Sequence, residues 1–240
     1  SPDYETKSSY NIRIKTTDSG NNSFEKSFTL SVNDLNETSP SGRPATSIEL
    51  QQLYIAYFSR PSDPIGLDYW TYKGISRSAF AANMYLQPEF NNVNSGLSVE
   101  AQVNQIYLNL FSREADITGL TYWAKQIRNG VLQLASIAND LIWAAENNSG
   151  SSNDKTALTN KTNAAVAYTA KIRESASSIL AYQAQSTSPW ITGNNLTEAK
   201  NYISGIDQYN THASWGIENS IAKFISLSTS SNYKLAIDSS

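Results

Sequence analysis

The chain has 240 residues, a formal net charge of -3, and charged side chains at only 16% of its positions. A nucleic-acid-binding protein needs a basic face, so this balance disfavours nucleic acid as a partner. The chain has no cysteine and no run of about 18 apolar residues, which excludes disulfides and thiolate metal sites and predicts no membrane insertion.

The N-terminal residues carry the alternation of a β-hairpin. Residues 9–15 alternate polar with apolar side chains, residues 17–22 form a turn cluster, and residues 24–32 alternate again. Lys26 is the lone polar residue on the apolar face of the second strand. Two strands alone are marginal in water, so we expect this hairpin to pair with more sheet upstream or in another chain.

The helical part begins after a linker rich in Pro, Gly and small polar residues, which runs over residues 33–47. Residues 46–49 (Thr-Ser-Ile-Glu) fit a capping box. The apolar spacing that follows, from Leu50 to Phe58, predicts an amphipathic helix.

A seventeen-residue pattern then occurs twice, at residues 54–70 and 107–123, and indicates a duplicated structural unit. A second helix is expected to begin at Asp63 and Asp116. Third helices are expected at residues 76–86 and 131–145, so each copy has three helices. The identical pairs, 53 residues apart, are Tyr54/Tyr107, Phe58/Phe111, Ser59/Ser112, Arg60/Arg113, Asp63/Asp116, Gly66/Gly119, Leu67/Leu120, Tyr69/Tyr122 and Trp70/Trp123.

Beyond the duplication, residues 147–154 read as a loop and residues 155–185 as one long Ala-rich helix. A last helical stretch is expected over residues 196–227. Its break is expected near Gly205 or between Thr211 and Gly216.

The duplicated block resembles the DUF4214 family, whose hallmark is Y-x-x-x-F-x-R-x-x-D-x-x-G-L-x-Y-W. Both copies match that hallmark, and the resemblance covers about residues 48–146. It implies a small all-helical module that accompanies large secreted bacterial surface proteins, including surface-layer proteins and calcium-binding repeat proteins. It also suggests surface polysaccharide as a ligand class.

The first 40 residues resemble the last third of a cadherin-like repeat. Residues 3–5 (Asp-Tyr-Glu) resemble its D-R-E signature, residues 17–20 its A-x-D-x-G, and residues 34–38 its D-x-N-D-N. The resemblance implies calcium ligands at the junction with the next domain, namely Asp3, Glu5, Asp18, Asp34, Asn36 and Glu37.

The expected fold class is therefore mainly α, a multi-helix domain containing two three-helix repeats. A short β-hairpin from a cadherin-like β-sandwich precedes it. The expected organisation is C-terminal strands of the β domain at residues 1–38, a linker at 39–47, two DUF4214-like repeats at 48–146, and additional helices at 155–228.

The repeated polar residues allow a structural and a functional interpretation. In the first, each Asp caps its second helix while each Arg pairs with that Asp or with nearby carbonyls. In the second, they contact a ligand. Duplication favours the structural interpretation, because a catalytic site is rarely needed twice in one small domain. The residues concerned are Arg60, Asp63, Gly66, Trp70, Arg113, Asp116, Gly119 and Trp123.

Fourteen Tyr and five Trp suggest a platform on which the apolar face of a sugar ring stacks. The repeated Tyr69, Trp70, Tyr122 and Trp123 are expected to be core residues rather than ligand contacts. The aromatic residues that the repeat leaves less constrained are the candidates for an exposed ligand-binding patch, namely Tyr57, Tyr72, Trp143, Trp190 and Trp215.

Catalytic signatures are scarce. His212 is the only histidine, and no G-x-S-x-G elbow or phosphate-binding glycine loop is present. A carboxylate pair stays open, although no spacing selects one. We expect no enzyme and no cofactor except calcium. The acidic residues that could meet are Asp68, Glu89, Glu114, Asp140, Glu146, Glu174 and Asp207.

The leading hypothesis is a non-catalytic part of a secreted bacterial surface protein, such as a surface-layer protein or adhesin. Its partners would be surface polysaccharide or neighbouring protomers. The chain opens without an initiator Met or a signal peptide, so an export signal is expected outside these residues. The alternatives are a polysaccharide-active hydrolase or its accessory carbohydrate-binding domain, and a pure spacer.

Overall fold

A computed structural model describes residues 9–31, 42–182, 195–211 and 214–231. As expected, the protein is mainly helical, with one antiparallel two-stranded hairpin near the N-terminus. The chain divides into two compact units, Ser1–Pro40 and Ser41–Ser240, and the division falls within the expected linker. In the described part of the chain, no helix combines the length and hydrophobicity that crossing a membrane requires.

The first unit contains the expected hairpin. Strands β1 (Ser9–Thr17) and β2 (Ser23–Ser31) pair in one unbroken register from Ser9↔Ser31 to Thr17↔Ser23. Because opposed residues share a face, Ile12 and Phe28 lie side by side. This apolar face is exposed, with 67% of Phe24 accessible to solvent. The expected pairing with further sheet stays a prediction.

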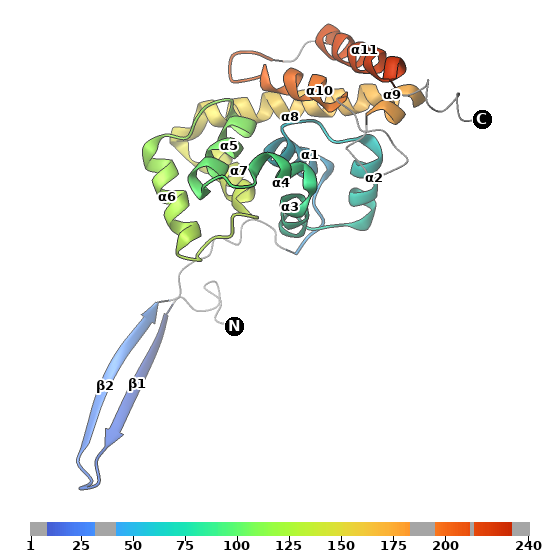
Figure 1. The fold of residues 1–240 in the computed structure, drawn as a ribbon. Coiled ribbons are helices and arrows are strands. Elements are labelled where there is room, and N and C mark those ends of the chain that lie inside the picture. Colours follow the sequence, from blue (N-terminus) through green and yellow to red (C-terminus); the bar gives the residue numbers. More distant parts are fainter. Residues whose placement is uncertain (1–8, 32–41, 183–194, 212–213, 232–240) are drawn as a thin grey trace. The chain divides into compact units, whose positions relative to one another are not determined.

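The second unit begins with two successive groups of helices that contain the duplicated pattern (Figure 1). The first group has four helices rather than the expected three. Pro88 explains the difference: it holds Gln87 in an extended conformation, which ends one helix, and it then occupies the first position of the next. The helices are α1 (Ser47–Phe58), α2 (Pro64–Lys73), α3 (Arg77–Leu86), α4 (Pro88–Asn94), α5 (Val99–Phe111), α6 (Ile117–Arg128) and α7 (Ile137–Asn147).

The remaining helices are shorter than the sequence suggests. The Ala-rich helix α8 (Ser152–Arg173) ends before residue 185, because Ser175 is extended and its hydroxyl caps a new helix, α9 (Ala176–Ala181). A single-turn 3-10 helix at Ser149–Ser151 precedes α8. Helices α10 (Asn195–Ser204) and α11 (Ser214–Ser231) follow, and the break between them includes the expected position at Gly205.

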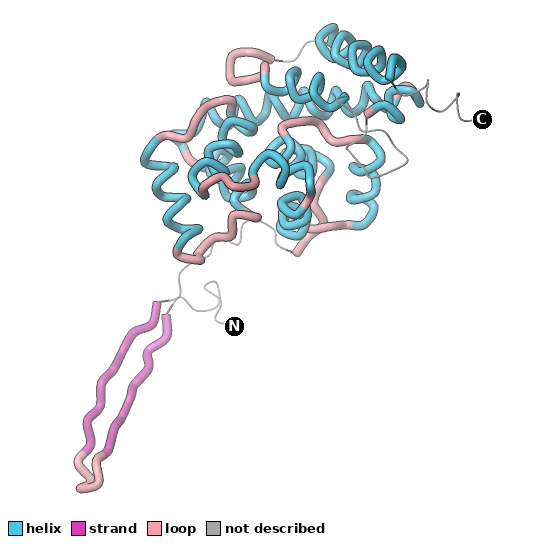
Figure 2. The backbone as a smooth tube through the Cα atoms, in the orientation of Figure 1, coloured by secondary structure: helices cyan, strands magenta, loops and turns pink. Residues whose placement is uncertain are grey.

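The second unit contains two hydrophobic cores. The larger core is built around α1, where Leu50, Leu53, Ile55 and Ala56 are fully buried. The smaller core is formed by α8 to α11. Helix α8 contributes to both, because it packs on the repeats along its length and its last turns also pack on α9, α10 and α11 (Figures 1 and 2). Residues of α8 are thus part of both cores.

The first helices of the two copies, α1 and α5, pack against each other. The Asn109 side-chain amide donates to the Ala56 carbonyl at 2.8 Å, and these positions are 53 residues apart, so equivalent positions touch. The two copies therefore meet through corresponding parts of their first helices. The Asn109 carbonyl, in turn, accepts from the Lys161 ammonium group at 2.7 Å. A polar donor from outside each helix thus satisfies one carbonyl in its last turn.

The first prediction concerns Lys161, whose side chain is 1% exposed. Burial lowers the pKa of its ammonium group from 10.5 to about 8. Between pH 8 and 10.5 the unfolded chain therefore holds a proton that the folded chain has released, so the contribution of Lys161 to stability rises with pH. Between pH 7.5 and 9.5, we expect the native chain to gain about 1–2 kcal/mol of unfolding free energy relative to Lys161→Met. Urea unfolding at both pH values measures the difference, and parallel pH profiles for the two proteins would contradict it.

Candidate functional site

The turn between the first and second helix has the same construction in both copies. Ser59 and Ser112 adopt left-handed conformations with φ of 55° and 56°, which end α1 and α5. A side chain from the preceding helix then holds the loop backbone: Gln51 accepts from the Ser62 N–H at 2.9 Å, and Asn104 accepts from the Ala115 N–H at 2.8 Å. Both loops are thus fixed by their own helices.

Asp63 and Asp116 cap the second helices, as expected. Each carboxylate accepts from the backbone N–H three residues later, at 2.6 Å from Gly66 and 2.8 Å from Gly119. A Cβ at Gly66 would lie 2.7 Å from the Asp63 carboxylate and 2.8 Å from the Tyr54 hydroxyl, so a larger residue would have to displace the side chain that caps the helix. The Asp-x-x-Gly part of the pattern therefore has a structural cause.

Arg60 and Arg113 do not pair with these Asp residues, which corrects one part of the structural interpretation. Arg60 Nε and Nη2 each donate to Glu89 at 2.8 Å, and Arg113 makes the same fork to Asp154 at 2.7 and 2.6 Å. Both acceptors lie in the first turn of a later helix, α4 and α8, where a carboxylate is favourable. The expected carbonyl contacts are present, to Pro61 O and Glu114 O.

The two arginine forks differ in burial. The Arg60 side chain is 2% exposed and the Arg113 side chain 40%. Burial disfavours the charged form of Glu89, but the charge and hydrogen bonds of Arg60, together with Lys200, outweigh it and hold the pKa of Glu89 below its ordinary value. Each guanidinium also lies 5.2 Å from a tyrosine ring centroid, Tyr54 in one copy and Tyr107 in the other.

The repeated Tyr-Trp pairs lie at the surface. The ring centroids of Tyr69 and Trp70 are 4.9 Å apart at 78°, and those of Tyr122 and Trp123 are 4.9 Å apart at 76°. Both tryptophans pack against the core, whereas 51% of Tyr69 and 53% of Tyr122 is exposed. The expectation that all four are core residues is therefore wrong for the two tyrosines. The structure brings each Tyr onto a Trp that fixes its edge-to-face orientation.

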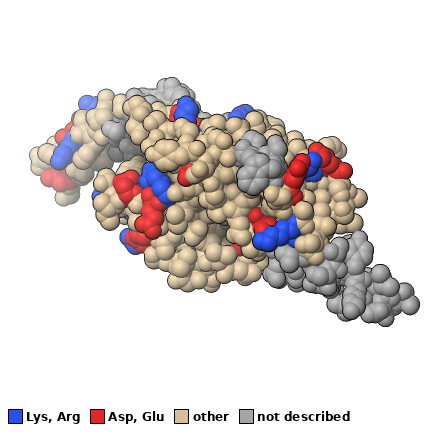
Figure 3. Space-filling view, turned by 90° about the horizontal axis from the view of Figure 1, so that it is seen from above, with Lys and Arg blue, Asp and Glu red and all other residues tan. Residues whose placement is uncertain are grey.

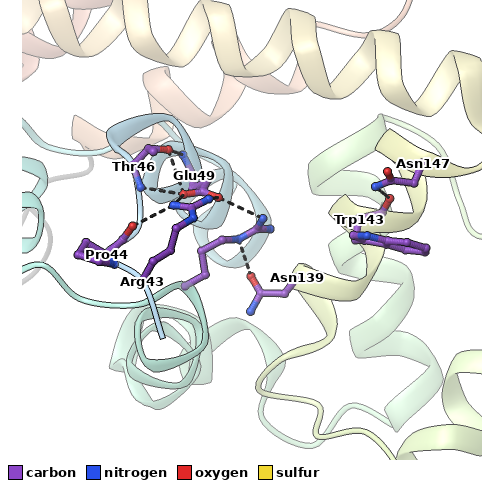
Figure 4. Close-up of polar contacts among 8 residues, drawn as sticks. Arg43, Pro44, Thr46, Glu49, Asn139, Trp143 and Asn147 are labelled. Atoms are coloured by element: carbon purple, nitrogen blue, oxygen red, sulfur yellow. Dashed lines mark hydrogen bonds and ion pairs between the residues drawn. The ribbon is translucent and has the colours of Figure 1, made fainter. Parts of the chain in front are cut away.

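The other candidate aromatic residues do not form one patch. Tyr57 is buried and its hydroxyl donates to the Ala135 carbonyl at 2.7 Å, so it is a core residue and not a surface contact. Tyr72 is 89% exposed on α2. Trp143 is half-buried, and its carbonyl accepts from Asn147 one turn later (Figure 4). Trp190 and the side chain of Trp215 lie outside the described residues.

Among the expected calcium ligands, only Asp18 is described. Its carboxylate closes the hairpin turn, accepting from the N–H groups of Gly20 and Asn22 at 2.8 and 2.9 Å and from the Asn22 amide at 3.2 Å. In the described ranges, no three His, Cys, Asp or Glu side chains are grouped so that they could hold a metal ion. The remaining expected ligands lie outside the described residues: Asp3, Glu5, Asp34, Asn36 and Glu37.

A polar cluster surrounds Glu49 at the N-terminal end of α1 (Figure 4). The expected capping box is present, with Thr46 and Glu49 each accepting from the other's backbone N–H. Arg43 donates to both Glu49 oxygens at 2.9 and 2.6 Å, and Arg77 approaches one of them at 3.5 Å. Arg77 Nε also donates to Asn139 at 3.3 Å. The sequence did not predict that Arg43 and Arg77 bind Glu49, because nothing in their spacing relates them to the capping box.

Several carboxylates named as possible catalytic pairs already have structural partners. Asp68 is bound by Arg173, with both contacts at 2.6 Å, and Glu174 by Lys171 at 2.8 Å. Asp207 accepts from the N–H groups at the start of the α10–α11 loop. Charged side chains on the face seen in Figure 3 occur in small groups of mixed sign between uncharged surfaces. No continuous basic area is visible on that face.

Comparison with known proteins gives one match. Residues 81–150 match the family model described as "Domain of unknown function (DUF4214)", so a DUF4214 domain is found there. This range includes the second copy of the pattern, while the first copy lies before it. No curated protein and no solved structure matches the chain. The surface-layer context and the cadherin-like resemblance therefore receive no support from these comparisons and stay predictions.

The second prediction uses the duplicated arginine as its own control. Arg60→Met should lower the free energy of unfolding by roughly 3–5 kcal/mol, because it leaves the buried Glu89 carboxylate short of its main partner. Arg113→Met should cost about 1 kcal/mol or less, because its fork is partly exposed to solvent. Denaturant unfolding of both variants measures the difference. Equal losses would show that burial does not set the strength of the two forks.

The third prediction concerns Asp140, whose pKa is raised from 3.8 to about 6, chiefly by burial. Because the folded pKa is the higher one, the ionised side chain weakens the fold above pH 6, and this penalty vanishes as pH falls towards 3.8. Asp140→Asn should therefore raise the unfolding free energy by about 1 kcal/mol at pH 7.5, a figure reduced for partial solvent screening. At pH 4 it should have little effect. A stabilisation that is equal at both pH values would contradict the assignment.

Proposed function

We propose that the helical unit is a non-catalytic binding module of a secreted bacterial surface protein, and that it holds surface glycan. The observation that carries this proposal is the exposure of two tyrosine rings at equivalent positions, Tyr69 and Tyr122, each on a tryptophan with nearly the same geometry. Every other repeated polar residue described above has a structural partner. The two tyrosine rings pack on their Trp neighbours, yet about half of each tyrosine stays exposed.

The chemistry suits an uncharged or weakly charged sugar. The apolar face of a pyranose stacks on an aromatic ring, and the phenol hydroxyl at the ring's edge is a hydrogen-bond donor and acceptor. The Trp beneath each Tyr restricts its motion, which reduces the conformational entropy lost on binding. The α-helices that carry the pairs are in turn held by the Asp63 and Asp116 caps.

Assembly with neighbouring protomers is the second candidate, and one observation favours it. Ile65, Tyr69 and Tyr72 follow each other at helical spacing on α2 and are 60%, 51% and 89% exposed. Exposed apolar stripes of this kind serve in protein contacts. The bacterial surface location and calcium at the junction belong to the same proposal and rest on the sequence resemblances alone.

The fourth prediction tests glycan binding. Chitohexaose, cellohexaose and phenol-extracted bacterial surface polysaccharide are titrated against the chain, with tryptophan fluorescence and the thermal unfolding midpoint as readouts. We expect at least one probe to bind. Replacing either tyrosine, Tyr69→Ala or Tyr122→Ala, should weaken binding at that site about five- to tenfold, which corresponds to roughly 1 kcal/mol for a stacked ring.

Tyr209→Ala is the matched control, because Tyr209 is 79% exposed but lies outside the Tyr-Trp pairs. It should bind like the native chain. If no probe changes either readout, glycan binding is refuted. Concentration-dependent self-association in sedimentation, lost in Tyr72→Ser, would then assign the α2 stripe to protomer assembly.

A further inference from the structure

The two Tyr-Trp pairs lie far apart within the helical unit. Tyr69 and Trp70 belong to α2, and Tyr122 and Trp123 belong to α6. Figure 1 shows α2 and α6 at opposite ends of the group formed by α1 to α7, with α1, α3, α4, α5 and α7 between them. A separation visible in projection is a minimum, so no view brings these helices together.

The packing of the two first helices accounts for this separation. Helices α1 and α5 meet at the centre of the unit, where Asn109 contacts its equivalent position Ala56. Each second helix leads away from that centre on its own side (Figure 2). The α2 pair and the α6 pair therefore belong to helices on separate sides of the repeats.

We propose that the helical unit is a bivalent cross-linker, with one glycan segment bound at the α2 pair and a second, separate segment at the α6 pair. This inference rests on the proposed function. Because the core helices fill the space between the pairs, a short oligosaccharide touches only one of them. The protein can therefore link one long polysaccharide molecule to another. The avidity of the resulting network exceeds the affinity of either site alone.

The surroundings of the two rings differ, so the sites have different affinities. The Lys73 ammonium group lies over the Tyr69 ring, 5.6 Å from its centroid. Its counterpart 53 residues later is Gln126, which carries no charge. A sugar that stacks on the Tyr69 ring competes with this cation–π contact, and a sugar on the Tyr122 ring meets no such competitor from the equivalent position. The α6 site is the tighter one by this comparison.

Isothermal titration with chitohexaose, or with whichever hexasaccharide binds, gives the stoichiometry. We expect two sites on the native chain. On each of Tyr69→Ala and Tyr122→Ala we expect one site in the same concentration range, because the altered site is about five- to tenfold weaker, and the larger loss of affinity in the latter. Lys73→Ala should tighten only the weaker site. The intensity of light scattered by mixtures with the long polysaccharide should pass through a maximum at intermediate protein concentration for the native chain and for Tyr209→Ala. Tyr69→Ala and Tyr122→Ala should show no such maximum.

The thermal unfolding midpoints of the variants establish that they remain folded, which the exposure of both tyrosines favours. One site on the native chain, lost in a single variant, overturns bivalency and leaves glycan binding standing. Two sites without a scattering maximum overturn cross-linking. Absence of any binding overturns the proposed function itself, and the three failures are therefore distinct.

Discussion

The buried Arg60 guanidinium is the contact on which the helical unit depends. Its fork holds Glu89 at the start of α4, and Glu89 also meets Lys200 of α10 at 3.3 Å. Tyr54 and Tyr182 lie on the guanidinium at 5.2 and 5.8 Å. One side chain therefore ties α1 and α4 of the first copy to the later helices α9 and α10. A charge buried this deeply is tolerated only because all of these partners are in place.

Local features of the helices were readable from the sequence, since their causes lie within a few residues. The capping box at Thr46, the Asp63 and Asp116 caps and the glycines that follow are all set by neighbours three residues away. The arginine partners were not readable, because Glu89 and Asp154 lie 29 and 41 residues further on and outside the repeated pattern. Tertiary packing alone selects them.

The exposed tyrosines show a second limit of pattern reading. Adjacent residues on a helix are about 100° apart, so on a helix at the surface of the unit the two rings of a Tyr-Trp pair can differ widely in burial. Identity between the two copies indicated that the pair matters, and the core was the expected reason. The structure places the tryptophan inwards and the tyrosine outwards in both copies. The repeated Tyr-Trp pair therefore forms part of the protein surface as well as part of the core.

The unequal space around the two repeated glycines has a consequence for how the copies can change. A methyl group at Gly66 would overlap Asp63 and Tyr54, whereas at Gly119 the nearest atoms, from Asp116 and Tyr107, are 3.3 Å away and need give only slightly. With Arg113 also the more exposed of the two arginines, the second copy carries the looser set of constraints. Random substitutions would therefore disrupt the structure of the first copy more often than that of the second. The second copy tolerates more changes, so new binding specificities can arise more easily on α5 and α6.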